Sequence, residues 1–189
     1  MKYEVEQKFP VGGFDAVRSR LERLHARFAA GHEETDLYFN HPSRDFRTTD
    51  EALRIRRRGD TNRVTYKGPK IDTTTKTRQE LELDLPEGEE TAVRWTELLE
   101  RLGFRQVGRV HKRRKKFDVE WQGRTVAGTL DKIDGLGSFV ELELVVDSDA
   151  VDAAREAVGA LASHLGLTTS ERRSYLQLLL ERGEGGVDG

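Results

Sequence analysis

Short segments whose alternate residues are charged are the feature that most constrains how this chain folds. Near the start, Glu4, Glu6 and Lys8 alternate with uncharged residues that include Val5 and Phe9. A β-strand places residues two apart on the same face, so the three charges would share one face and the apolar side chains the other. An ordinary half-buried strand turns its charged face to water. Here the pattern recurs along the chain, which indicates a common purpose for the charged faces.

The recurring charges are sorted by sign within each segment. Two segments are basic and a later one is acidic, with the alternating residues Arg54, Arg56 and Arg58, then Lys112, Arg114 and Lys116, then Glu141 and Glu143. Like charges about 7 Å apart on one face repel by about 2 kcal/mol at an effective dielectric constant near 20. A surface that serves only solubility mixes the two signs. Clusters of one sign therefore predict partners that neutralise them, a polyanion over the bases and metal ions over the acids.

The composition excludes several other classes of protein. The 189 residues include 32 basic and 34 acidic ones, for a net charge of −2, so nucleic acid and anionic membranes are not expected partners. There is no cysteine, which excludes disulfides, thiolate nucleophiles and cysteine-bound metals. No apolar run approaches the ~20 residues that cross a bilayer, and no signal peptide is visible. We expect a cytoplasmic protein.

Four amphipathic helices are expected between the strands. The apolar positions of the first lie at 14–28, and it stops near Gly31. The second follows Pro86 and has its apolar positions at 95–102, and the third has them at 154–165 and ends at Gly166. A fourth begins at a capping box made by Thr168 and Glu171. No linker divides the chain, so residues 1–182 are expected to form a single domain and residues 183–189 a disordered tail.

These elements predict an α+β fold, a closed antiparallel β-barrel with the helices packed outside. Its charged faces would line the interior, and a closed barrel of about eight strands can enclose one small ligand. Arginine and lysine suit phosphate oxygens, and carboxylates without histidine suit Mg²⁺ or Mn²⁺. This inventory fits phosphoryl or nucleotidyl transfer. No Walker loop is present, and among the histidines only His111, which starts a basic strand, is a candidate for ligand contact.

The ordered motifs resemble the CYTH superfamily, the triphosphate tunnel metalloenzymes. The segment EVEQK is similar to the ExExK signature, and YFNHPSRDF, EALRIR, TYKGPK, TRQELE, KRRKKF, LDKIDGLGSFVELE and RSYLQLLL follow in order. YFNHPSRDF and TYKGPK resemble the class IV adenylate cyclase (CyaB-like) branch most.

This resemblance implies an eight-stranded tunnel that holds a triphosphate and Mg²⁺ or Mn²⁺. It assigns metal binding to Glu4, Glu6, Asp131, Glu141 and Glu143, and triphosphate binding to Lys8, Arg54, Arg56, Lys67, Arg78, Lys112 and Arg114. Glu4, Glu6, Lys8 and Asp131 would be the catalytic residues.

The implied reaction is conversion of ATP to 3′,5′-cyclic AMP and pyrophosphate. The alternatives that the same residues leave open are a tripolyphosphatase or thiamine triphosphatase, and a nucleotide- or polyphosphate-binding protein without turnover. Members of this superfamily are often dimers, so a homodimer also stays open.

Overall fold

A computed structural model describes residues 2–70 and 78–183, and its strands form one antiparallel order. The order is β1 (Lys2–Val11), β9 (Gly137–Asp147), β8 (Arg124–Ile133), β7 (Arg105–Trp121), β3 (His32–Asn40), β4 (Ala52–Arg58), β5 (Thr61–Lys70) and β6 (Arg78–Leu85). A two-residue strand, β2 (Arg27–Phe28), pairs with β7 outside this order. The α+β class is therefore confirmed.

The expectation of a closed barrel is corrected. Among the described residues β1 and β6 end the strand order, so no strand pairing closes the sheet, and the sheet is open. Alternation in the sequence fixes which face each side chain occupies, but closure depends on a further pairing between edge strands, which alternation does not specify.

The chain divides into two compact units, and the division falls within β7. The first unit holds residues 2–31 and 113–173, and the second holds residues 32–70, 78–112 and 174–183. The proposed disordered tail, apart from Gly183, lies outside the described residues, and the single domain stays a prediction.

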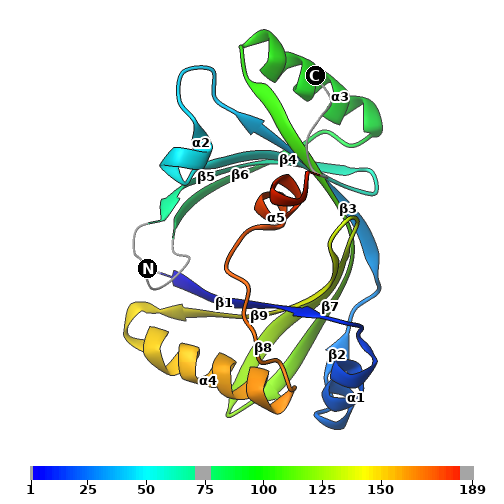
Figure 1. Ribbon diagram of the computed structural model, residues 1–189, viewed down its shortest axis with the longest axis vertical. Helices are drawn as coiled ribbons and strands as arrows, with labels where there is room; N and C mark the ends of the chain where they lie inside the picture. The colour runs from blue at the N-terminus through cyan, green and yellow to red at the C-terminus, as the bar shows by residue number, and fades with distance from the viewer. Residues whose placement is uncertain (1, 71–77, 184–189) are drawn as a thin grey trace. The chain divides into compact units, whose positions relative to one another are not determined.

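The core of the first unit lies between its sheet and helix α4 (Val151–His164), which packs against β1 and β9 (Figure 1). The register places Val5 opposite Leu144 and Phe9 opposite Val140, and all four are buried. Because strand side chains alternate, residues such as Glu6 and Lys8 point to the opposite face of the sheet, where the charges lie. The remaining helical segments of this unit are α1 (Asp15–Arg23) and the 3₁₀ turn η1 (Ser148–Ala150).

The second unit is built in the same way around helix α3 (Glu89–Arg101). Ala92 and Leu99 of α3 pack with Phe39 of β3 and Ile55 of β4, and all four are buried. The charged residues of these strands lie on the opposite face. The short helix α2 (Phe46–Thr49) and the helix α5 (Tyr175–Arg182) also belong to this unit.

Two expected helices have different limits. The first ends at Arg23, because His25 adopts a left-handed backbone (φ 57°) and residues 27–28 pair with β7 instead. The capping box is wrong: α5 begins after Ser174, whose side chain caps it by accepting a hydrogen bond from the Gln177 backbone. The Glu171 backbone instead donates to the Lys8 carbonyl at 2.7 Å. Among the described residues no helix is both long and apolar enough to span a membrane.

A glycine in β8 gives a test of this packing. A Cβ at Gly128 would lie 2.3 Å from the Phe117 ring and 2.7 Å from the Glu141 carbonyl oxygen, so one atom must shift. We expect Gly128→Ala to lower the free energy of unfolding by about 1–3 kcal/mol. Gly159→Ala in α4 is the control, because nothing lies within 4 Å of its Cβ, and it should stabilise by about 0.5–1 kcal/mol. Urea unfolding measures both, and similar midpoints for the two variants would contradict the packing.

Candidate functional site

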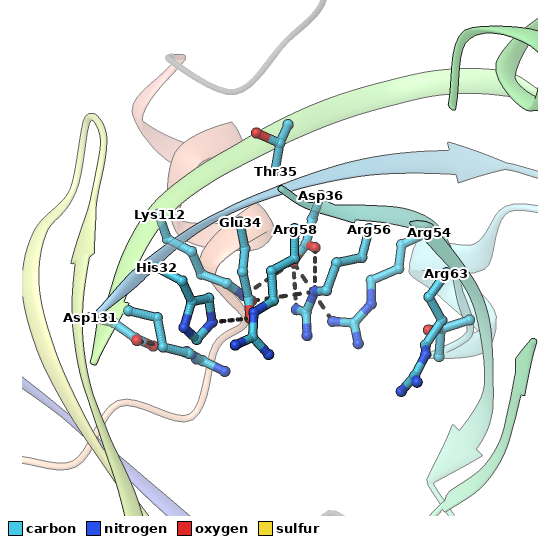
Figure 2. Close-up of polar contacts among 12 residues, drawn as sticks. His32, Glu34, Thr35, Asp36, Arg54, Arg56, Arg58, Arg63, Lys112 and Asp131 are labelled. Carbon is cyan, nitrogen blue, oxygen red and sulfur yellow. Dashed lines mark hydrogen bonds and ion pairs between the residues drawn. The ribbon is translucent and has the colours of Figure 1, made fainter. Parts of the chain in front are cut away.

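The charged face of the second unit is centred on β4. Arg54, Arg56 and Arg58 project from that strand on the side that also carries Glu34 of β3, whereas Thr35 points to the other side (Figure 2). This is the alternation expected from the sequence. The charged face of this unit therefore carries the arginines of β4 together with charged side chains of the neighbouring strands.

Asp36 of β3 is the central partner of the basic side chains. Its carboxylate accepts two hydrogen bonds from Arg56, from Nε at 2.6 Å and from Nη2 at 2.8 Å, and one from Lys112 Nζ at 3.2 Å. Arg54 Nη1 lies 3.7 Å away. Burial opposes ionisation of Asp36, but the Arg56 hydrogen bond and the charges of Lys112 and Arg54 outweigh it and hold its pKa below the usual range.

Glu34 forms a second buried anchor two residues earlier. Its carboxylate lies 3.2 Å from Lys112 Nζ, 3.4 Å from Arg56 Nε and 2.8 Å from His32 Nε2. Glu34 and Lys112 are both almost completely buried. Two carboxylates therefore hold the cations of this face from the β3 side.

On β5, the basic side chains of this face are also paired with carboxylates, which come from β6. Arg63 of β5 binds Asp84 at 2.7 Å and Glu82 at 3.0 Å, and Lys67 binds Glu80 at 2.5 Å. The register places Arg63 opposite Asp84 and Lys67 opposite Glu80. The expectation of charges segregated by sign thus holds along β4 and β5. It is wrong for the face as a whole, because these two basic strands lie between β3 and β6, whose carboxylates pair with their bases.

Carboxylates face one another in the first unit. The register of β1 and β9 places Glu6 directly opposite Glu143, and two pairs further along it places Lys8 opposite Glu141. Burial and the charges of Glu6 and Glu141 raise the pKa of the Glu143 carboxyl above its usual value. A divalent cation would relieve this repulsion, so these residues fit a metal ion.

Arg114 of β7 joins two of the expected metal ligands. Its guanidinium bonds both oxygens of Asp131, with Nε at 2.7 Å from Oδ1, and reaches Glu141 Oε2 at 2.8 Å. The side chain of Asp131 is 0% exposed and that of Arg114 is 12% exposed. The structure thus brings a predicted phosphate ligand and two predicted metal ligands into a single ion-pair network.

Lys8 is held by the segment that follows α4. Its buried ammonium donates to the carbonyl oxygen of Arg173, while the Arg173 side chain binds Glu171. Those hydrogen bonds from Arg173 lower the pKa of Glu171 to about 2. Lys8 therefore lies on the charged face of β1, and the backbone carbonyl of Arg173 already holds its ammonium group.

The other predicted site residues are less closely placed. Glu4 lies at the exposed end of β1. Arg78 begins β6, and its side chain lies outside what the structure describes. His111 binds Thr35 at 2.9 Å, and Thr35 points away from the arginines, so His111 is not on the charged face. Within residues 2–70 and 78–183 no cluster of three or more metal-binding side chains is found, so the set of five metal ligands stays a prediction.

Sequence reasoning missed Glu34 and Asp36, the two carboxylates that organise the basic face. A signal was present in the string HEETDLYF, where positions 32, 34, 36 and 38 are polar and alternate with Leu37 and Phe39 at its end. The apolar residues identified the strand, but the identity of its neighbour was needed to give its acids a partner.

Comparison with known proteins assigns the family. The CYTH domain matches residues 2–175. A candidate adenylate cyclase of Methanocaldococcus jannaschii is 36% identical over 181 residues, which cover 93% of this chain and 97% of that protein. Adenylate cyclase CyaB of Aeromonas hydrophila is 28% identical over 183 residues, or 94% and 88% of the two chains.

Solved structures show the same fold. A protein of Pyrococcus horikoshii OT3 is 43% identical with a TM-score of 0.80, covering 95% of this chain and 99% of that chain. A Hippeastrum protein, described as a candidate adenylyl cyclase with a dominant triphosphatase activity, is 17% identical with a TM-score of 0.65 over 97% of both chains, a likeness of fold alone. With the domain match spanning β1 to the start of α5, the chain belongs to the CYTH domain family.

Proposed function

We propose that this protein is a metal-dependent enzyme that acts on a triphosphate and converts ATP to 3′,5′-cyclic AMP and pyrophosphate. The observation that carries the proposal is the relationship to two proteins named as adenylate cyclases, each aligned over more than nine-tenths of this chain. The charged faces of the two units supply residue types that this chemistry needs.

The basic residues are assigned to the phosphates. Guanidinium and ammonium groups stabilise the negative charge on phosphate oxygens, and a held side chain does so without reorganising during the reaction. The proposed triphosphate ligands are Lys8, Arg54, Arg56, Lys67, Arg78, Lys112 and Arg114.

The carboxylates are assigned to Mg²⁺ or Mn²⁺. The facing pair Glu6 and Glu143, with the raised pKa of Glu143, supports a cation there. The proposed metal ligands are Glu4, Glu6, Asp131, Glu141 and Glu143. The proposed catalytic residues are Glu4, Glu6, Lys8 and Asp131. When bound, the metal would neutralise charge on the phosphate oxygens.

Cyclisation and hydrolysis differ in the nucleophile and in the phosphorus attacked. In the cyclase reaction the ribose 3′-hydroxyl loses its proton and its oxygen attacks the α-phosphorus. The bond from that phosphorus to the oxygen bridging the α- and β-phosphates breaks, and pyrophosphate leaves with that oxygen. The chain must therefore hold the 3′-oxygen in line and keep water away. A triphosphatase would direct water at the terminal phosphorus with the same bases and acids.

Product analysis tests the proposal. We expect the purified protein with ATP and Mg²⁺ or Mn²⁺ to give cyclic AMP and pyrophosphate on chromatography, most readily at alkaline pH, where the 3′-hydroxyl is easier to deprotonate. A parallel assay measures orthophosphate released from tripolyphosphate. Orthophosphate without cyclic AMP would replace the cyclase by a triphosphatase, and tight binding without either product would leave a binding protein.

A further inference from the structure

One buried carboxylate in the second unit contacts three of the proposed phosphate ligands. Asp36 is 1% exposed, and its two oxygens are shared among Arg56, Lys112 and Arg54, which come from strands on both sides of β3. Because so little of the side chain is exposed, Asp36 has no surface on which to bind a ligand itself. Its effect must pass through the cations around it.

Arg54, Arg56 and Lys112 need fixed partners if their charged groups are to keep one arrangement. Arginine and lysine side chains have many rotamers, and three like charges in one place repel one another. The two-pronged contact of Arg56 with Asp36 fixes the plane of its guanidinium, which a single point contact would not do. The anchor therefore determines where the donors point before any ligand arrives.

We infer that Asp36 is a positioning residue that holds Arg54, Arg56 and Lys112 in the arrangement in which they act on the triphosphate. The inference rests on the proposed function, and it adds a residue that touches neither substrate nor metal. Asp36 also repels the polyanion, since it places a negative charge behind the bases. It should therefore favour correct alignment of the triphosphate at some expense in affinity.

This opposition of effects predicts a specific kinetic signature. Asp36→Asn keeps the shape of the side chain, loses the charge and removes the two-pronged contact that fixes Arg56. Glu34 still lies 3.2 Å from Lys112 and 3.4 Å from Arg56, so these side chains stay on the face but lose their fixed orientation. Binding of tripolyphosphate should stay within threefold of wild type or become tighter, because the basic face gains net positive charge. Turnover should fall, because displacement of donors by about 1 Å can cost on the order of 100-fold. We expect kcat to drop between 10-fold and 100-fold with KM unchanged or lower.

The matched control is Asp84→Asn in β6. Asp84 also forms an ion pair with an arginine on the same face, Arg63, but its side chain is 77% exposed. It should change kcat and KM less than twofold. Binding is measured by titration calorimetry with tripolyphosphate and Mg²⁺, turnover with the substrate that the wild type uses, and folding by circular dichroism.

The outcomes separate the inference from the function on which it rests. Wild-type kcat in Asp36→Asn, or parallel losses of binding and turnover, would overturn the positioning role. If Asp36→Asn does not fold, Asp36→Glu keeps the charge but moves the carboxylate by one methylene, and the same split between kcat and binding is expected; wild-type kinetics there would overturn the inference. If the wild-type protein itself neither binds nor converts a triphosphate, the proposed function fails first, and the inference fails with it.

Discussion

Arg114→Met is expected to cost about 3–5 kcal/mol of folding free energy, because it leaves a buried carboxylate without its cation. The Asp131 side chain is 0% exposed, and Arg114 bonds both of its oxygens as well as one oxygen of Glu141. Urea unfolding of wild type and variant measures the loss. Because breaking a buried pair costs far more than the pair contributes, adding Asp131→Asn to the variant should recover part of the stability.

The neighbouring residue supplies the control. Arg113 forms an ion pair with Asp134 at 3.3 Å in which the two side chains are 59% and 55% exposed. Arg113→Met should cost less than about 1 kcal/mol, as exposed pairs generally do. Equal destabilisation by the two variants would mean that burial of the Arg114 network contributes nothing.

Glu143→Gln is expected to stabilise the fold while removing activity. The raised pKa of Glu143, caused by burial and by the charges of Glu6 and Glu141, means that its ionised form is disfavoured in the folded state. The variant removes that penalty, so its melting temperature in EDTA should exceed that of wild type. If Glu143 holds the metal, turnover should fall by at least ~100-fold, and Mg²⁺ should raise the melting temperature less than in wild type.

The pH dependence has a definite sign. A carboxyl with a raised folded pKa contributes stability that is fully present below its unfolded pKa of about 4.3, and that contribution is lost as the pH rises through the folded pKa. The advantage of Glu143→Gln should therefore be larger at pH 8 than at pH 4.5. Glu120→Gln, at an exposed position of β7, is the control and should change neither the melting temperature nor the turnover. An active Glu143→Gln enzyme at limiting Mg²⁺ would remove Glu143 from the metal site.

The faces of the strands could be predicted from the sequence, but their neighbours could not. A period of two is a local property, so Arg54 and Arg56 could be placed on one face from the letters alone. The contact of Arg56 with Asp36 joins residues 20 positions apart, and its existence depends on strand order and register. The alternation within one strand fixes the face of each side chain, but it does not identify which strand lies beside it.

The same limit explains why the start of the last helix, α5, is predicted wrongly. Thr168 and Glu171 have the spacing of a capping box, yet the Glu171 backbone bonds β1 and its carboxylate bonds Arg173. Local propensity was outweighed by a hydrogen bond to a strand about 160 residues earlier in the chain. By contrast, the helix that carries Trp95 and Leu99 is confirmed as α3, because a helical spacing of apolar residues is a local property of the sequence.

The alternation along β4 limits how this strand can change in length. Its arginines at even positions face the charged side, and Leu53 and Ile55 face the core. An insertion or deletion of one residue within β4 would exchange these two sets, burying guanidinium groups against α3 and turning the leucine and isoleucine toward the carboxylates of β3. A change of two residues would keep the parity of the faces. Among natural variants of this chain, odd-numbered insertions should therefore fall in the turn around Gly59, where neither face is committed.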